Sequence, residues 1–100
     1  MTGHSYAGGL FLALCHDFRI MTSKSKICFS EILVGCGLGP GYNALACNLL
    51  DTQVARQLVM GQKVKAPEAL KMQAVDSVYN SEAEAEAYVV GFAKQFVSRA

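Results

Sequence analysis

The sequence predicts an α/β fold in which short strands alternate with helices. Three patterns carry this prediction: a glycine-rich turn that runs straight into an apolar helix at 8–15, two short apolar strands at 17–22 and 27–29, and later segments with helical spacing. With 52% hydrophobic and 17% charged residues, the 100-residue chain is too apolar to be a disordered segment. We expect a single domain over residues 1–100.

The first helix begins after a turn of small and polar residues. Two consecutive glycines, Gly8 and Gly9, end this turn, and good helix formers fill 10–14. Because such a turn normally follows a strand, we expect Met1 and Thr2 to be the last residues of a strand that lies mainly upstream. The backbone N–H groups at this helix start could hold a negative oxygen. A packed connection between a strand and a helix is the other explanation of the turn.

Two strands and a shaped loop follow the first helix. Apolar and polar side chains alternate within 17–22, which is typical of a short strand, and 27–29 is expected to form a second strand after a polar turn. Glu31 comes at the end of this strand, between apolar neighbours on both sides. Residues 32–41 contain four glycines and one proline, so we expect a loop without regular structure there.

The remainder of the chain is expected to be mainly helical. In its last segment acidic residues gather in the first turns and basic residues in the last turns, which matches the dipole of a helix. We expect helices at 42–50, at 52–60 with a cap at Asp51 and an end at Gly61, at 66–72, and from Ser81 to the end of the chain, with a short strand at 75–79.

Charge and histidine patterns exclude several classes of function. A net charge of +1 with scattered basic residues provides no basic face for nucleic acid. His4 and His16 have no partner at the spacing of a metal site, so we expect no metal. Residues 3–7 nearly match the G-x-S-x-G nucleophile elbow of hydrolases, but the required acid followed by a histidine is missing downstream.

Cysteine spacing and hydropathy indicate the compartment class. None of the four cysteines forms a C-x-x-C pair, and no apolar run approaches the eighteen or so residues of a membrane span. We therefore expect a soluble intracellular protein with reduced thiols and no membrane span.

Several motifs together resemble one known family, the enoyl-CoA hydratase/isomerase (crotonase) superfamily. The resemblance is strongest over residues 1–80 and leaves 81–100 as a terminal helix. It implies a partial crotonase (ClpP-like) fold, incomplete at both ends, in which an upstream half would supply further strands and the second oxyanion N–H. The motifs that carry it are residues 3–9, 12–20, 30–35, 54–61, 66–70 and 75–78.

The resemblance also implies a reaction. Hydratases of the superfamily use two glutamates, but this chain has Phe11 at the first position and Glu31 at the second, twenty residues on. A single carboxylate that moves a proton without using water is the pattern of Δ3,Δ2-enoyl-CoA isomerases. The plant-type members are the most similar, through residues 2–4, 16–17 and 63–65. The resemblance assigns a catalytic role to Glu31, the oxyanion N–H to Gly8, and substrate contacts to Tyr6, Ala7, Gly9, Phe11, Leu38 and Pro40.

The implied function is the movement of a double bond from C3 to C2 of an acyl-CoA thioester in fatty-acid β-oxidation. Coenzyme A is part of this substrate, so no separate cofactor is expected. The resemblance further implies a homo-oligomer of the trimer type and a peroxisomal location, although residues 98–100 do not match the Ser-Lys-Leu signal. A catalytically silent crotonase-like module for binding or assembly is the alternative, followed by a 2-enoyl-CoA hydratase.

Overall fold

Short strands and helices alternate along the chain, as the sequence predicts. The computed structural model describes residues 1–99. Within this range the helix that we expect from the glycine turn, the capped helix after Asp51 and the terminal helix are all present. The elements are β1 (Ser5–Tyr6), α1 (Gly8–Leu14), β2 (Ile20–Thr22), β3 (Lys26–Cys28), the 3₁₀ helix η1 (Glu31–Val34), α2 (Pro40–Leu49), α3 (Thr52–Val59), β4 (Val64–Lys65), α4 (Ala66–Lys71), β5 (Ser77–Tyr79) and α5 (Glu82–Val97).

The strands form two small sheets. In the first, β3 lies in the centre, with β1 parallel to it on one side and β4 antiparallel on the other, so that Ile27 is opposite both Ser5 and Val64. In the second sheet β2 and β5 run parallel, with Met21 opposite Val78. The loop from β3 to η1 therefore leaves the middle of the three-stranded sheet.

The start of the chain differs from the expected arrangement. The strand that leads into α1 is β1 at Ser5–Tyr6, rather than a strand that ends at Met1 and Thr2. Its two residues are extended because they pair with β3, a partner that local sequence cannot reveal. Met1 still lies beside β2, where its amino group donates to the Ile20 carbonyl at 2.7 Å and its carbonyl accepts from the Thr22 N–H at 3.1 Å.

The glycine-rich segment after β3 is more regular than expected. Glu31–Val34 forms one 3₁₀ turn, which ends at Gly35 with a φ of 74°, and only 35–39 are irregular. Pro40 is the first residue of α2 rather than part of the loop, because its fixed φ suits the first helical turn and its missing N–H costs nothing there. The glycines therefore separate two ordered turns.

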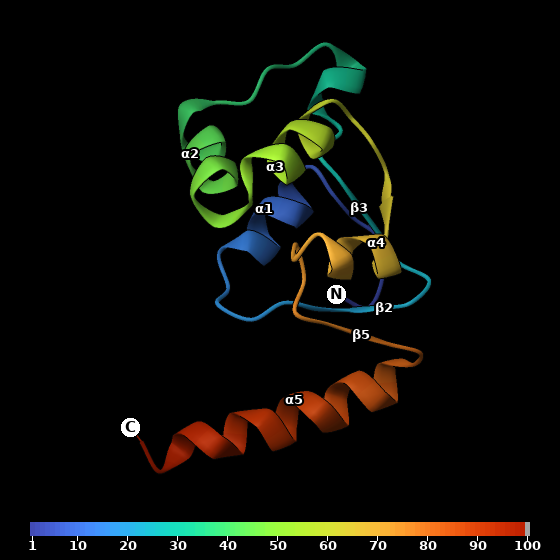
Figure 1. Cartoon of the computed structure of the whole chain (residues 1–100), viewed down its shortest axis with the longest axis vertical. Helices are drawn as coiled ribbons and strands as arrows, with labels where there is room; N and C mark the ends of the chain where they lie inside the picture. Colours follow the sequence, from blue (N-terminus) through green and yellow to red (C-terminus); the bar gives the residue numbers. More distant parts are fainter. Residues whose placement is uncertain (100) are drawn as a thin grey trace.

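The core lies between the three-stranded sheet and the helices α1, α3 and α4. Side chains from each of these elements exclude water, with Leu10, Ile27, Leu58, Val64 and Ala69 among them at 1% exposure or less. Helix α5 lies apart from this core as a separate layer beneath β2 and β5 (Figure 1). Only Ala85 of α5 is buried.

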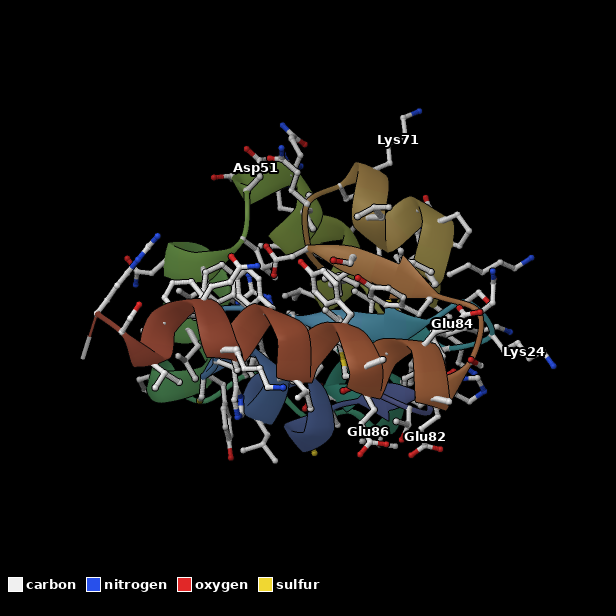
Figure 2. All side chains as sticks on the ribbon, turned by 90° about the horizontal axis from the view of Figure 1, so that it is seen from below. Lys24, Asp51, Lys71, Glu82, Glu84 and Glu86 are labelled. Atoms are coloured by element: carbon white, nitrogen blue, oxygen red, sulfur yellow. The ribbon has the colours of Figure 1, made fainter. Side chains whose placement is uncertain are left out.

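The acidic residues of α5 gather at its first turns. Figure 2 shows Glu82 and Glu86 projecting to one side of this helix, while Asp51 and Lys71 project from the opposite side of the molecule. The Ser81 side chain caps the helix by accepting from the Glu84 N–H at 3.2 Å, as a serine before a helical pattern predicts. In the part of the chain that the structure describes, no helix is long and apolar enough to cross a bilayer.

Candidate active site

Glu31 lies beside a small, mainly apolar cavity of about 130 Å³. One of its carboxylate oxygens, Oε2, is shielded from solvent and has no hydrogen-bond partner among residues 1–99. Buried carboxylate oxygens in proteins are normally paired, so an unpaired one on a residue that lines a cavity marks a candidate functional group. Besides Glu31, the cavity is lined by Phe29, Ile32, Cys36, Gly37, Leu38 and Val59.

Two backbone hydrogen bonds close the turn that carries Glu31. The Cys36 N–H donates to the Glu31 carbonyl at 3.0 Å, and the Gly35 N–H donates to the Ile32 carbonyl at 3.2 Å. This pairing needs a left-handed residue at the end of the turn, and Gly35 adopts it without a steric penalty. The turn fixes the backbone of Glu31, while its Oε2 atom depends on packing alone.

The resemblance assigns Phe11 to the position of the first glutamate of hydratases. Its ring is 2% exposed and lies between two other rings, with centroid distances of 4.4 Å to Phe29 and 4.5 Å to Tyr42. Phe29 also lines the Glu31 cavity, so this aromatic stack joins α1 to the cavity wall. Phe11 does not itself line the cavity.

The turn before α1 holds an alanine in a backbone conformation that favours glycine. Ala7 has a φ of 50° and a ψ of −126°. Its N–H donates to the Cys28 carbonyl at 3.0 Å, and its carbonyl accepts from Leu10 and Phe11. Strained backbone of this kind costs about 1–3 kcal/mol and persists where the surrounding structure requires it. The Ala7 N–H is therefore engaged, and the next free donors are those of Gly8 and Gly9.

Gly8 is approachable from outside the fold. A Cβ at Gly8 would meet nothing within 4 Å, whereas a Cβ at Gly9 would lie 3.6 Å from Ser5 Oγ. Gly9 borders a second hollow, of about 300 Å³, which is also lined by Leu12, Ala13, His16 and Phe18. Neither glycine lines the Glu31 cavity.

The other predicted substrate contacts do not all lie at the Glu31 cavity. Leu38 is partly buried and shares the cavity with Glu31. Tyr6 lies elsewhere, with its ring stacked on His4 at 5.5 Å and the Lys63 Nζ atom 5.6 Å above it. Pro40 is exposed at the start of α2 and does not line the Glu31 cavity.

Cys28 is a buried thiol between the glycine turn and the cavity. Its Sγ donates to the Gly61 carbonyl at 3.3 Å. Burial raises the pKa of the Cys28 thiol, while the positive charge of Lys63 lowers this pKa to a smaller extent. Cys28 is therefore protonated at neutral pH and acts here as a packing residue. Within residues 1–99, no three histidine, cysteine or carboxylate side chains lie close enough to hold a metal ion.

Sequence reasoning missed the contributions of α2 and α3 to the site. Val59 reaches the cavity from the end of α3, and Tyr42 covers Phe11 from α2. Tyr42 belongs to none of the motifs named above, and the 54–61 motif contains Val59 without indicating that it lies beside Glu31. Both residues meet the site through tertiary packing. A helix that is strongly amphipathic, as α3 is over Thr52–Val59, signals which face is buried but not what that face contacts.

Comparison with known proteins places these features in a family. Residues 1–100 match the model of the family described as enoyl-CoA hydratase/isomerase. The peroxisomal enoyl-CoA delta isomerase 2 of Arabidopsis thaliana is 35% identical over 86 residues, which cover 82% of this chain and 36% of that protein.

Two solved structures extend the comparison. The enoyl-CoA hydratase of Thermoplasma volcanium has a TM-score of 0.81 and 35% identity, covering 92% of this chain and 38% of its own. A putative enoyl-CoA hydratase of Thermobifida fusca, in complex with acetoacetyl-CoA, has a TM-score of 0.84 and 25% identity, covering 96% of this chain and 38% of its own. The chain thus spans little more than a third of the relatives that it matches, and its structure represents part of the crotonase fold.

Proposed function

The chain belongs to the enoyl-CoA hydratase/isomerase family, and we propose from this that its protein is a Δ3,Δ2-enoyl-CoA isomerase. The observation that carries the proposal is the unpaired carboxylate oxygen of Glu31, a residue that lines an apolar cavity. The resemblance adds that the buried ring of Phe11 takes the place of the first glutamate of hydratases. The substrate is a 3-enoyl thioester of coenzyme A, and the product is the conjugated 2-enoyl thioester.

Glu31 is the proton carrier in this proposal. Its carboxylate removes a proton from C2, which lies between the thioester carbonyl and the double bond and is acidified by both. The electron pair left at C2 delocalises onto the thioester oxygen and gives a dienolate. When the same proton returns to C4, the electrons of the former C3–C4 π bond form the C4–H bond, the charge leaves the oxygen, and the double bond lies between C2 and C3. No water is consumed, and the carboxylate ends in its starting state. A positioned general base contributes about 10²–10⁴-fold to such a rate.

Phe11 supports isomerisation over hydration. Hydration needs a second group to hold and activate a water molecule, and the stack of Phe11 between Phe29 and Tyr42 offers none. The 35% identity to a hydratase structure matches the 35% identity to an isomerase, so overall similarity does not separate the two reactions.

Gly8 supplies the oxyanion donor in this proposal. Negative charge develops on the thioester oxygen when C2 loses its proton, and a backbone N–H aimed at that oxygen stabilises it by about 3–4 kcal/mol. The open space around Gly8 and its place directly after the strained Ala7 support this role. Phe11, three residues later in α1, stacks on Phe29, which lines the Glu31 cavity.

The family relationship supports the wider setting as well. The Arabidopsis relative carries the word peroxisomal in its name, and the Thermobifida structure holds acetoacetyl-CoA. We accordingly propose an acyl-CoA thioester as the ligand, with no separate cofactor, a role in fatty-acid β-oxidation, a peroxisomal location and a trimer-type homo-oligomer.

Replacement of Glu31 tests the proposal. The conversion of 3-hexenoyl-CoA to trans-2-hexenoyl-CoA is followed by the absorbance of the conjugated thioester for the parent protein, for Glu31→Gln and for Glu68→Gln. Glu68 is an exposed glutamate of α4 and serves as the matched control. We expect Glu31→Gln to lose at least 10²-fold in kcat and Glu68→Gln to retain the parent rate. Equal rates for all three proteins would refute the role of Glu31.

The same assay separates the alternatives. A silent binding module would bind acetoacetyl-CoA in a calorimetric titration but would leave 3-hexenoyl-CoA unchanged. A hydratase would add water to crotonyl-CoA faster than it isomerises 3-hexenoyl-CoA, which would contradict the argument from Phe11.

A further inference from the structure

We infer that Gly61 is a positioning residue for Glu31, acting through the turn η1 that carries this carboxylate. The inference rests on the proposed function for its activity readout and on the structure for its geometry. Gly61 lies two residues after the end of α3 and thirty positions after Glu31 in the sequence. Its one side-chain hydrogen bond among the described residues is to Cys28 and not to Glu31.

The backbone of Gly61 requires glycine for two separate reasons. Its φ of 79° lies in the left-handed region, which residues with a Cβ rarely adopt. A Cβ at this position would also lie 2.9 Å from Leu33 Cδ2 and 3.1 Å from Ile32 Cγ2. Both side chains belong to η1, so Gly61 is the surface on which the Glu31 turn rests.

The two colliding side chains differ in how they can respond. Leu33 is 60% exposed, and its outer atoms can swing into solvent. Ile32 Cγ2 is bonded directly to Cβ in a β-branched side chain that is stiff at χ1. Ile32 also lines the Glu31 cavity, so relief of this contact moves the residue next to the carboxylate.

Gly61 is itself held firmly in place. Its N–H donates to the Leu58 carbonyl at 3.0 Å, and its carbonyl accepts from Cys28 Sγ at 3.3 Å. Leu58 and Cys28 are both fully buried, so the end of α3 is fastened to the core and to β3. A collision at Gly61 is therefore relieved by movement of η1 and not of α3.

Glu31 is sensitive to such a movement because no hydrogen bond holds its Oε2 atom. In most proteins a buried carboxylate is oriented by donors that would resist a small shift of the backbone. Here the packing of Ile32 and Leu33 on Gly61 performs that task, so a shift of a few tenths of an ångström passes directly to the carboxylate. Displacements approaching 1 Å can cost about 10²-fold in rate.

The test is a comparison of Gly61→Ala in two backgrounds, the parent and Ile32→Ala/Leu33→Ala, which lacks both colliding side chains. In the parent background we expect Gly61→Ala to lower kcat for 3-hexenoyl-CoA about 10-fold or more, with KM within twofold. In the double-alanine background the same change should lower kcat less than threefold. Gly35 has a similar φ, and a Cβ at this position would meet nothing within 4 Å. The melting temperature of Gly35→Ala therefore measures the effect of backbone strain without a collision.

A second readout does not depend on catalysis. The chemical shifts of ¹³C-labelled glutamate carboxyl groups are measured by NMR at one fixed pH, with the Glu31 signal assigned from its loss in Glu31→Gln. Gly61→Ala should change the chemical shift of Glu31 in the parent background only and leave that of Glu68 unchanged. An unshifted Glu31 signal, or equal kcat losses in both backgrounds, would overturn the positioning role. An inactive parent protein with a shifted signal would contradict the proposed function and leave the positioning role intact.

Discussion

Phe11 lies between the rings of Phe29 and Tyr42 and exposes 2% of its surface. The ring belongs to the hydrophobic core beneath α1. In the proposed reaction it also takes the place of a carboxylate that would activate water. The next residue, Leu12, points away from the core and is 65% exposed.

The stack predicts a large and specific loss of stability for Phe11→Ala. Removal of a buried phenylalanine leaves a cavity and typically costs about 3–5 kcal/mol. We expect a loss of this size in the free energy of unfolding from urea titration. Leu12→Ala, on the same helix, should change the free energy by about 0.5 kcal/mol or less. Similar losses for both variants would show that Phe11 is not a core residue.

At the scale of elements, α3 matters because its C-terminal end carries Val59 to the cavity and Gly61 to the Glu31 turn. The helix begins with a side-chain cap, in which Asp51 Oδ1 accepts from the Gln53 N–H at 2.9 Å. Asp51→Ala removes this acceptor and should lower the free energy of unfolding by about 1 kcal/mol. Asp51→Asn keeps an acceptor oxygen and should stay close to the parent. Equal losses in the two variants would argue against the cap.

Local signals explain which elements the sequence predicts. Asp51 and Ser81 mark helix starts through their own side chains, so the helices after them could be located within a residue or two. The strands β1 and β4 have only two residues each and no alternation of their own. Both are extended because they pair with Ile27 from opposite sides, and such pairing depends on contacts distant in sequence.

The same distinction applies to the site. Glu31 and Leu38 are seven positions apart, and a family resemblance was enough to place them together. Val59 and Gly61 reach the site from the C-terminal end of α3 and the residues after it. Their motif, 54–61, supports the family resemblance but does not show that they contact the turn of Glu31. Pro40 belongs to α2 because proline suits a first helical turn, which outweighs the irregularity that its neighbouring glycines suggest.

At the scale of the whole molecule, α5 forms a layer of its own against β2 and β5 (Figure 1). Aromatic rings attach it: Phe92 meets Phe18 edge to face at 4.8 Å, and Phe96 lies 6.2 Å from the same ring. With Ala85 as its only buried residue, α5 has little apolar surface removed from water. Regions with few buried contacts open at a lower free energy than the core.

Hydrogen exchange tests this layered stability. The amides of α5 should exchange before those of α1, and Phe92→Ala should speed exchange in α5 about tenfold without affecting α1. The factor follows from the loss of aromatic pairs worth about 0.5–1.5 kcal/mol each. Val97→Ala, at a 75% exposed position of the same helix, is the control. Uniform acceleration across α1 and α5 would show that the two layers open as one unit.

The central claim is that Glu31 alone carries a proton from C2 to C4 of an enoyl thioester. Its most direct test is the position of deuterium in the product formed from 3-hexenoyl-CoA that carries deuterium at both C2 positions, read by mass spectrometry at early times. If Glu31 transfers the proton, the parent protein forms trans-2-hexenoyl-CoA with deuterium at C4. Glu31→Gln should form this product at a rate at least 10²-fold lower. Product without deuterium at C4, or undiminished product from Glu31→Gln, would contradict this claim.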